Sequence, residues 1–195
     1  MRIVVIGAGK VGRSLADGLA GADHDVVVPA RGQEGAALPG AEAVVLAVPF
    51  PAVSEVLPAL ADGLAGIVVV DCTHPVGPGL SHGLSSAGSG SQVVQRLVPG
   101  ASVVKAFSIY GWANLADNSF PGPLRPLMMI AGDDTSATST VAGLASDLGW
   151  DPLVVGGLDQ ALHLEHLTLL WIRMVRGQGR SPHLVWARLE RPAEL

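Results

Sequence analysis

Short apolar runs recur along the chain, and a helical or loop segment follows each of them. The runs predict strands at residues 2–6, 25–30, 43–48, 67–71, 102–106, 127–131 and 152–155. The early runs are continuously apolar, which is typical of parallel strands that are buried on both faces of a sheet. Helical patterns between and after the strands predict helices at residues 10–21, 51–64, 91–97, 135–148 and 158–176.

This alternation of strands and helices implies right-handed crossover connections. We therefore predict an α/β fold: a Rossmann-type, doubly wound, mostly parallel sheet with a C-terminal helical extension. Loops rich in glycine, alanine, serine or proline are expected at residues 32–40, 73–90 and 118–126, but no linker divides the chain. We expect a single domain over residues 1–195, in which residues 157–195 form a helix and tail packed on the sheet.

The composition narrows the class of protein. Hydrophobic residues make up 49% of the chain and charged residues 15%, which suits a large buried core and argues against disorder. The formal net charge is −5 and lysine and arginine do not cluster, so we expect no nucleic-acid partner. Cys72 is the only cysteine, which excludes an intramolecular disulfide. No apolar stretch approaches the roughly 18 residues of a membrane span, and no signal peptide is evident, so we expect a cytoplasmic protein.

The first predicted strand leads directly into three glycines, Gly7, Gly9 and Gly12, in G-x-G-x-x-G spacing. The spacing alone is a weak signal, but here it follows a strand and opens a helix, as a dinucleotide-binding fingerprint requires. The first glycine allows a tight turn, the second lets the backbone approach a pyrophosphate, and the third lets helix and strand pack closely. The helix N-terminus then offers free N–H groups to the phosphates. The candidate residues in this loop are Gly7, Ala8, Gly9, Lys10, Val11 and Gly12.

The end of the second strand distinguishes NAD from NADP. An NAD site usually has Asp or Glu about twenty residues after the glycines, where the carboxylate binds the ribose 2′-hydroxyl. Here the strand ends at Ala30 and Arg31, with Glu34 further along. The forked guanidinium of Arg31 suits a 2′-phosphate, and Lys10 could add positive charge nearby. This local chemistry predicts NADP(H), and the alternative is a solvated arginine in a loop.

The third strand ends in small residues and a proline: Ala47, Val48 and Pro49. In a Rossmann sheet this carboxyl edge holds the cofactor and the substrate, so small residues leave room there for the ribose and the nicotinamide. Further motifs follow at residues 71–75, 95–107, 131–134, 148–152 and 164–172. Thr73, Lys105 and Ala106 are further cofactor-binding candidates at this edge, and a structural ion pair is the alternative for Lys105.

Together these motifs resemble the coenzyme F420:NADP oxidoreductase family, whose wider group includes the cytoplasmic domain of the six-transmembrane ferric reductases. The resemblance covers nearly the whole chain and is most specific at residues 104–107 (Val-Lys-Ala-Phe), 131–134 (Ala-Gly-Asp-Asp) and 164–172. It implies direct hydride transfer between NADP(H) and a deazaflavin (coenzyme F420) or a related flavin. Such a transfer needs alignment and exclusion of water rather than a general acid or base.

Two motifs depart from the family. Its members commonly read Thr-Asn-Pro where this chain has Thr-His-Pro at residues 73–75, and Lys-Ala-Phe-Asn where it has Lys-Ala-Phe-Ser at residues 105–108. Both changes come just after strand ends on the expected ligand edge. The NADP half of the site therefore resembles the family, whereas the electron-acceptor half differs from it.

Three side chains on the acceptor half are candidate catalytic residues: His74, Ser108 and Tyr110. His74 could donate a hydrogen bond or a proton near neutral pH, or it could be a loop histidine without a role. Tyr110 could protonate a reduced carbonyl or imine, although lining a pocket is the favoured role. Cys72 has no nearby base, so we interpret it as a small hydrophobic residue.

The predicted C-terminal helix contains His163, Glu165 and His166. The two histidines share a helical face, but no third ligand of suitable spacing is visible, so we expect no metal site. The helix is apolar nearly all round, which indicates burial in the core or against a second subunit. We therefore expect a homodimer.

Three functions fit these observations. The favoured one is an NADP-dependent oxidoreductase that exchanges a hydride with coenzyme F420 or a related flavin. The first alternative is an NADPH-dependent reductase of a small carbonyl or imine substrate, in which His74 and Ser108 would assist proton transfer. The second alternative is a non-catalytic module that senses NADP(H). The expected partner of an enzyme here is a small-molecule or flavin-type electron acceptor.

Overall fold

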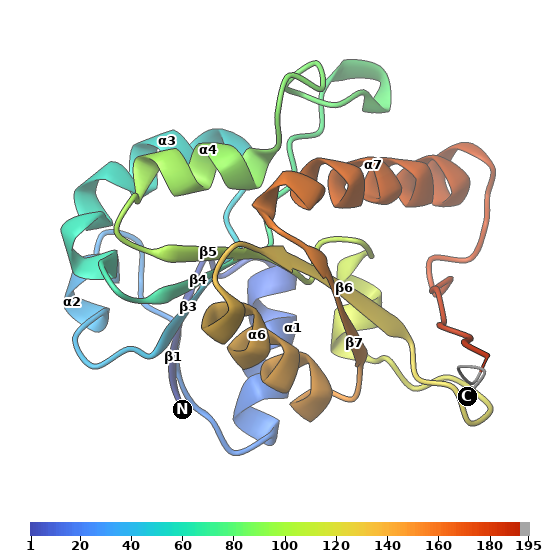
Figure 1. Ribbon diagram of the computed structural model, residues 1–195, viewed down its shortest axis with the longest axis horizontal. Helices are drawn as coiled ribbons and strands as arrows, with labels where there is room; N and C mark the ends of the chain where they lie inside the picture. The colour runs from blue at the N-terminus through green and yellow to red at the C-terminus, as the bar shows by residue number, and fades with distance from the viewer. Residues whose placement is uncertain (192–195) are drawn as a thin grey trace.

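A seven-stranded sheet forms the centre of the computed structural model, which describes residues 1–191 (Figure 1). Its strands are β1 (Arg2–Ile6), β2 (Asp25–Val27), β3 (Ala43–Leu46), β4 (Val68–Asp71), β5 (Ser102–Lys105), β6 (Leu127–Gly132) and β7 (Asp151–Gly156). The strand order is β2-β1-β3-β4-β5-β6-β7, and neighbouring strands are parallel except for β5 and β6, which are antiparallel. The predicted Rossmann-type, mostly parallel sheet is therefore confirmed.

Helices cover both faces of the sheet, which explains why its strands are apolar throughout. They are α1 (Lys10–Gly21), α2 (Glu34–Ala37), α3 (Val53–Val56), α4 (Gly90–Leu97), α5 (Trp112–Ala116), α6 (Thr135–Asp147) and α7 (Ala161–Ile172). Helices α1 and α6 lie on one face, and α3 and α4 lie on the other (Figure 1). Within β1, Ile3 and Val5 join the core under α1 and α6, whereas Val4 and Ile6 join the core under α3 and α4.

The direction of winding reverses at β1. The chain passes from β1 to β2 on one side, and then to β3 on the other side of β1. Such a reversal in an open α/β sheet leaves a crevice at the carboxyl ends of the two central strands, and ligands bind there. The turn into α1 and the segment after β3 both start from this edge.

Proline accounts for the largest differences from the predicted elements. Strand β2 ends at Val27 rather than at residue 30, because Pro29 has no N–H to donate in a sheet. The helix predicted at residues 51–64 is the short α3 between 3-10 turns at Phe50–Ala52, Pro58–Leu60 and Asp62–Leu64, since Pro58 interrupts the helical hydrogen bonds. The helix predicted at residues 158–176 begins as a 3-10 turn (Leu158–Gln160), continues as α7 and ends as a π-helical turn (Arg173–Gly177).

The segment after α7 is hydrogen-bonded to the sheet and to α7. The carbonyl of Trp186 accepts from Leu127 N–H at 2.8 Å, and Trp171 Nε1 donates to Leu184 O at 2.7 Å. The Tyr110 hydroxyl donates to Leu127 O at 2.8 Å and accepts from Trp186 N–H at 3.1 Å. Residues 192–195 of the predicted tail lie outside the described residues. Among residues 1–191, no helix has the length and apolar character that a membrane crossing requires.

Candidate functional site

The turn between β1 and α1 is built around three glycines. Gly7 has a φ of +115°, and a Cβ there would meet the carbonyl oxygen of Ala47 at 2.6 Å. A Cβ on Gly12 would lie 1.8 Å from the carbonyl oxygen of Gly7, so only glycine lets α1 pack this closely against the turn. Nothing lies within 4 Å of a Cβ placed on Gly9. The turn is therefore closed on the side of the sheet and open above Gly9, where a phosphate can approach the backbone.

Helix α1 begins at this turn without a cap. Its N-cap residue is Gly9, and within the described chain no side chain caps the helix and no acidic residue occupies its first turn. Two other helices are capped: Ser89 accepts from Gln92 N–H at 3.1 Å in α4, and Asp134 accepts from Ala137 N–H at 2.9 Å in α6. The free N–H groups and the positive end of α1 therefore favour an anion at Gly9.

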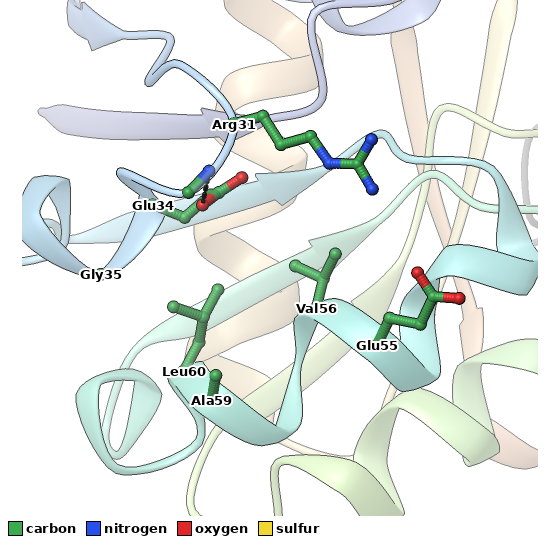
Figure 2. Close-up of a pocket in the computed structure, with 8 residues that line it drawn as sticks. Arg31, Glu34, Gly35, Glu55, Val56, Ala59 and Leu60 are labelled. Carbon is green, nitrogen blue, oxygen red and sulfur yellow. Dashed lines mark hydrogen bonds between the residues drawn. The ribbon is translucent and has the colours of Figure 1, made fainter.

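A cleft of about 420 Å³, here called the Arg31 cleft, lies between the segment after β2 and the segment that contains α3 (Figure 2). Its lining residues are Arg31, Gly32, Glu34, Gly35, Glu55, Val56, Ala59 and Leu60. The Arg31 side chain extends from one wall, and Glu55 and Val56 belong to the other (Figure 2). The Glu34 carboxylate is engaged by the backbone, because it accepts from Gly32 N–H at 2.8 Å. Arg31 supplies the positive charge of this cleft, as a 2′-phosphate would require.

A second cleft of about 280 Å³, here called the His74 cleft, lies above the ends of β1, β3 and β4. Its lining residues are Gly9, Lys10, Val11, Ala47, Val48, Pro49, Phe50, Cys72, Thr73 and His74. Half of the predicted cofactor-binding residues thus line this cleft. Because β1 lies between β2 and β3, the two clefts flank the glycine turn, which is the arrangement that a dinucleotide needs when its pyrophosphate lies on α1.

Two polar side chains of the His74 cleft have buried atoms that lack partners. Both ring nitrogens of His74 and the hydroxyl oxygen of Thr73 are buried and have no hydrogen-bond partner among residues 1–191. Buried polar atoms are nearly always paired, so these atoms point to a ligand that completes them. Burial, and after it the Lys105 ammonium, lowers the pKa of His74 to about 3. The ring is therefore neutral at neutral pH and offers one donor and one acceptor.

Lys10 lies at the His74 cleft and not beside Arg31, so the two cations do not share one phosphate as the sequence analysis considered. The Lys10 ammonium lies 4.5 Å from the ring centroid of Trp112, a cation–π contact. Trp112 begins α5 and is 44% exposed. The Lys10–Trp112 pair therefore borders the His74 cleft on the side of α5.

Lys105 and Ala106 lie beneath the clefts rather than in them. Lys105 is fully buried, and its ammonium donates to Asp71 Oδ2 at 3.2 Å and to the carbonyl oxygen of Thr73. Ala106 is buried as well. Of the two roles considered for Lys105, the geometry supports the ion pair, because an enclosed ammonium does not reach a cofactor. Lys105 contacts the site only indirectly, through its hydrogen bond to the carbonyl oxygen of Thr73.

Ser108 and Tyr110 are not among the residues that line the His74 cleft, and both contact the C-terminal part of the chain. The Ser108 carbonyl accepts from the hydroxyl of Thr168 in α7 at 3.1 Å. Tyr110 stacks on Trp150 with ring centroids 5.4 Å apart, and burial raises the pKa of its hydroxyl above the usual range. That hydroxyl bonds the backbone of Leu127 in β6 and the backbone of Trp186, so it links the C-terminal segment to β6. Of the three catalytic candidates, only His74 lines the cleft.

Several lining residues were not predicted from the sequence: Phe50, Glu55, Val56 and Leu60. They belong to the segment after β3, in which the sequence pattern predicted one helix over residues 51–64, just after Phe50. Cys72 lines the His74 cleft too, but burial raises the pKa of its thiol, so it does not supply a thiolate nucleophile. No group of three or more His, Cys, Asp or Glu side chains that could hold a metal ion occurs in the described part of the chain.

The chain is similar to known proteins in sequence and in fold. The profile of a family described as NADP oxidoreductase, coenzyme F420-dependent, matches residues 2–39, which include the glycine turn and Arg31. Metalloreductase STEAP3 of Rattus norvegicus is 32% identical over 183 residues, which cover 86% of this chain and 36% of that protein. The chain thus spans little more than a third of the length of this curated relative.

Two solved structures share the fold over most of both chains. A candidate F420-dependent NADP reductase from Arthrobacter sp. FB24 superposes with a TM-score of 0.82 at 26% identity, and the match covers 91% of this chain and 94% of that chain. A hypothetical protein from Sinorhizobium meliloti superposes with a TM-score of 0.72 at 28% identity, over 83% of this chain and 88% of that chain. Glycine turn, fold and relatives agree: the chain is similar to the coenzyme F420-dependent family of NADP oxidoreductases.

Proposed function

We propose that this protein transfers a hydride between NADP(H) and a deazaflavin (coenzyme F420) or a related flavin. The observation that carries the proposal is the make-up of the His74 cleft. This cleft adjoins the glycine turn, and it contains buried polar atoms without a hydrogen-bond partner among residues 1–191. Its histidine is neutral at neutral pH. Hydride transfer between two aromatic rings requires their alignment, and the polar atoms of this cleft can orient a nicotinamide ring.

Residues of the chain match each part of NADP(H). The bare N-terminus of α1 at Gly9 binds the pyrophosphate. Arg31 binds the 2′-phosphate in the Arg31 cleft. Thr73 and His74 offer hydrogen-bond donors and acceptors to the carboxamide of a nicotinamide, and the small side chain of Ala47 leaves room for its ring. The chain thus holds the coenzyme as an extended molecule along the carboxyl edge of the sheet.

The acceptor binds between the His74 cleft and the Lys10–Trp112 pair. The exposed indole of Trp112 offers apolar surface, and the Lys10 ammonium lies over its ring and adds a positive charge. A planar deazaflavin or flavin with an anionic side chain fits both features, because aromatic rings stack and a cation attracts the anionic group.

Reduction of a small carbonyl or imine is the less favoured reaction. That chemistry needs a proton as well as a hydride, and a general acid works best when its pKa lies near the working pH. His74 has a pKa of about 3, so it is a poor source of a proton at neutral pH. Under this alternative, His74→Ala would lower turnover sharply without weakening NADPH binding.

The test is a spectroscopic assay with purified protein, NADPH and, in turn, coenzyme F420, FMN and FAD. We expect loss of the oxidised absorbance band of at least one of these acceptors at a rate that saturates with NADPH. A chelator should not change that rate. If the protein binds NADPH but reduces none of the three, the proposed acceptor class is wrong.

A variant at Trp112 tests the acceptor side separately. Trp112→Ala should raise the KM for the acceptor and leave the Kd for NADPH unchanged, because the indole does not line the His74 cleft and adjoins it only through its contact with Lys10. Trp112→Phe keeps an aromatic face and should restore most of the loss. An unchanged KM in Trp112→Ala would exclude stacking on this residue.

We further propose that the enzyme acts in the cytoplasm as a homodimer. Leu170 on α7 is 50% exposed and Val154 in the edge strand β7 is 46% exposed, and a second subunit would cover such side chains. Cys72 is a free thiol, as a reducing compartment favours. Sedimentation velocity would test the dimer, and a single species with the mass of one chain would exclude it.

A further inference from the structure

A third cleft, of about 180 Å³ and here called the Trp171 cleft, lies between α5 and the end of α7. It is lined by residues 111–113, Trp171, residues 175–176 and Pro182. Clefts that enclose a whole small-molecule ligand usually measure roughly 300–1,000 Å³, so a cleft of this size holds only part of a ligand. The Trp171 cleft is therefore a candidate subsite for a molecule that also occupies a neighbouring cleft.

The walls of the Trp171 cleft are held in place by the protein itself. A Cβ on Gly111 would lie 2.7 Å from the ring of Trp171, so the start of α5 packs directly on this indole. Trp171 Nε1 donates to Leu184 O at 2.7 Å, and Asn114 Nδ2 donates to Pro182 O at 2.8 Å. These two hydrogen bonds attach the C-terminal segment to both α7 and α5, so the cleft does not need a ligand to form.

The indole of Trp112 connects the Trp171 cleft to the His74 cleft. Trp112 lines the Trp171 cleft, and Lys10 lines the His74 cleft. The Lys10 ammonium lies 4.5 Å from the centroid of the Trp112 ring. The two clefts therefore meet at one exposed aromatic side chain, and a molecule that lies over Trp112 can reach into both.

Arg176 gives the Trp171 cleft a positive charge. It lies in the π-helical turn that ends α7, it is exposed, and it forms no ion pair with any carboxylate of residues 1–191. A guanidinium stays protonated in proteins, so this charge is permanent. None of the residues that line the cleft is acidic. The carboxylate of Asp117, just after α5, accepts from Ser119 N–H at 2.9 Å and lies outside the lining.

The segment that contains Arg176 differs in charge from the chain as a whole. The formal net charge of the chain is −5, yet residues 166–189 contain neither Asp nor Glu. The same residues contain four arginines: Arg173, Arg176, Arg180 and Arg188. Of these, Arg188 is paired with Asp151 at 3.0 Å. The end of α7 and the segment after it therefore attract anions, although the protein is acidic.

We propose that the Trp171 cleft binds the anionic side chain of the electron acceptor, and that Arg176 makes the protein prefer acceptors that carry one. This inference rests on the proposed function, since it requires a planar acceptor over Trp112. The ring lies towards the His74 cleft, and the phosphate or carboxylate of its side chain reaches Arg176. The forked guanidinium pairs with the oxygens of such a group through two hydrogen bonds. Arg176 binds the acceptor away from the ring that exchanges the hydride, so it determines specificity.

The test compares acceptors that share a ring and differ in charge: FMN with riboflavin, and coenzyme F420 with the deazaflavin fragment that lacks its phosphate. The quantity measured is kcat/KM at saturating NADPH. The wild type should prefer the charged member of a pair by about tenfold, as a hydrogen bond to a charged group provides. Raising the ionic strength from about 0.05 M to about 0.5 M should reduce this preference. Arg176→Gln should remove most of it, and Arg176→Lys should keep part of it.

Two further variants separate binding in the Trp171 cleft from a general attraction of anions. Ala113→Leu fills the cleft and leaves every charge in place, so it should reduce the preference as Arg176→Gln does. Arg96→Gln removes an exposed arginine from α4, on the other face of the sheet, and is the matched control. It should leave the preference unchanged. Calorimetry should give the same Kd for NADPH in all of these variants, since none of the three positions lines the His74 cleft or the Arg31 cleft.

Three outcomes would contradict these expectations. No preference within either pair, or a preference that Arg176→Gln leaves intact, would overturn the inference and leave the proposed function in place. A preference that is lost in Arg176→Gln but kept in Ala113→Leu would also overturn it, because the charge would then act without the cleft. Binding of NADPH without reduction of any of the four acceptors would overturn the proposed function, and this inference with it.

Discussion

Gly12 packs its α-carbon against the carbonyl oxygen of Gly7, so closely that a Cβ would lie 1.8 Å from that oxygen. This contact joins the first turn of α1 to the end of β1 and fixes where the helix begins. Gly9, between the two, faces open space instead. The three glycines of one motif are therefore required for different reasons. Gly12 is required by close packing, and Gly7 by close packing and a positive φ. Gly9 leaves the backbone open to a phosphate.

The first prediction separates these roles. Gly9→Ala should abolish or greatly weaken NADPH binding and change stability by less than about 1 kcal/mol, since its Cβ meets no atom of the protein. Gly12→Ala should lower the free energy of unfolding by about 2 kcal/mol or more, because the clash is with backbone. Calorimetric binding and urea unfolding check the two. Gly143→Ala, also in open space but on α6, is the control and should bind normally. Normal NADPH binding by Gly9→Ala would refute the placement of the pyrophosphate.

The second prediction concerns the choice of coenzyme. Arg31→Ala should weaken NADPH by about tenfold to a hundredfold, since hydrogen bonds to a charged group contribute roughly 1.5–3 kcal/mol, and it should leave NADH nearly unchanged. Arg31→Lys keeps the positive charge but lacks the forked guanidinium donors, so we expect a smaller loss of NADPH affinity than in Arg31→Ala. Glu55→Gln removes a carboxylate from the facing wall and should tighten NADPH. Parallel losses for NADPH and NADH in Arg31→Ala would exclude a 2′-phosphate contact.

The third prediction follows from the lowered pKa of His74. Its ordinary value of 6.5 falls to about 3 in the folded protein, so between these values the unfolded chain binds more protons than the folded one. The free energy of unfolding should therefore rise with pH across this window and be lost as the pH falls through it. His74→Asn, which introduces the residue common in the family, should show a shallower slope in urea unfolding at a series of pH values. An identical slope in the wild type would contradict the lowered pKa.

The fourth prediction is the cost of removing the buried cation. Lys105→Met leaves Asp71 and Glu165 facing each other without a counter-charge, so we expect a loss of about 3–5 kcal/mol in the free energy of unfolding. Arg13→Met, at an exposed cation on α1, should stay within about 0.5 kcal/mol. If the free energy of unfolding fell as little in Lys105→Met as in Arg13→Met, water would have to reach the carboxylates of Asp71 and Glu165.

The candidate residues of the phosphate end could be chosen from the sequence alone, because that end is local. Gly7 to Gly12 span the turn and the start of α1, and Arg31 follows β2 by a few residues, so neither depends on a distant partner. The strands could be located for a related reason: burial on both faces requires apolar residues at every position. The apolar pattern at residues 51–64 was misleading, since it records which face is buried and not whether Pro58 permits a continuous helix.

The side-chain contacts on the electron-acceptor side of the site could not be predicted in the same way, because they join segments that are distant in the sequence. Lys105 meets Asp71, 34 residues earlier, only because β4 and β5 pair in the register that aligns them. Tyr110 resembled a catalytic residue by its place after a strand, yet its hydroxyl binds Trp186, 76 residues later. For both residues the side-chain type was informative, but its partner depended on the strand order and on the path of the C-terminal segment.

A nucleotide bound at Gly9 would complete the first turn of α1 as Ser89 completes that of α4. The coenzyme would then act as the capping group that the polypeptide lacks, and occupancy would raise the melting temperature in proportion to the logarithm of its concentration. A cell depleted of the dinucleotide would contain a less stable form of this protein, which proteases remove faster. The abundance of the protein would in this way follow the supply of its own coenzyme.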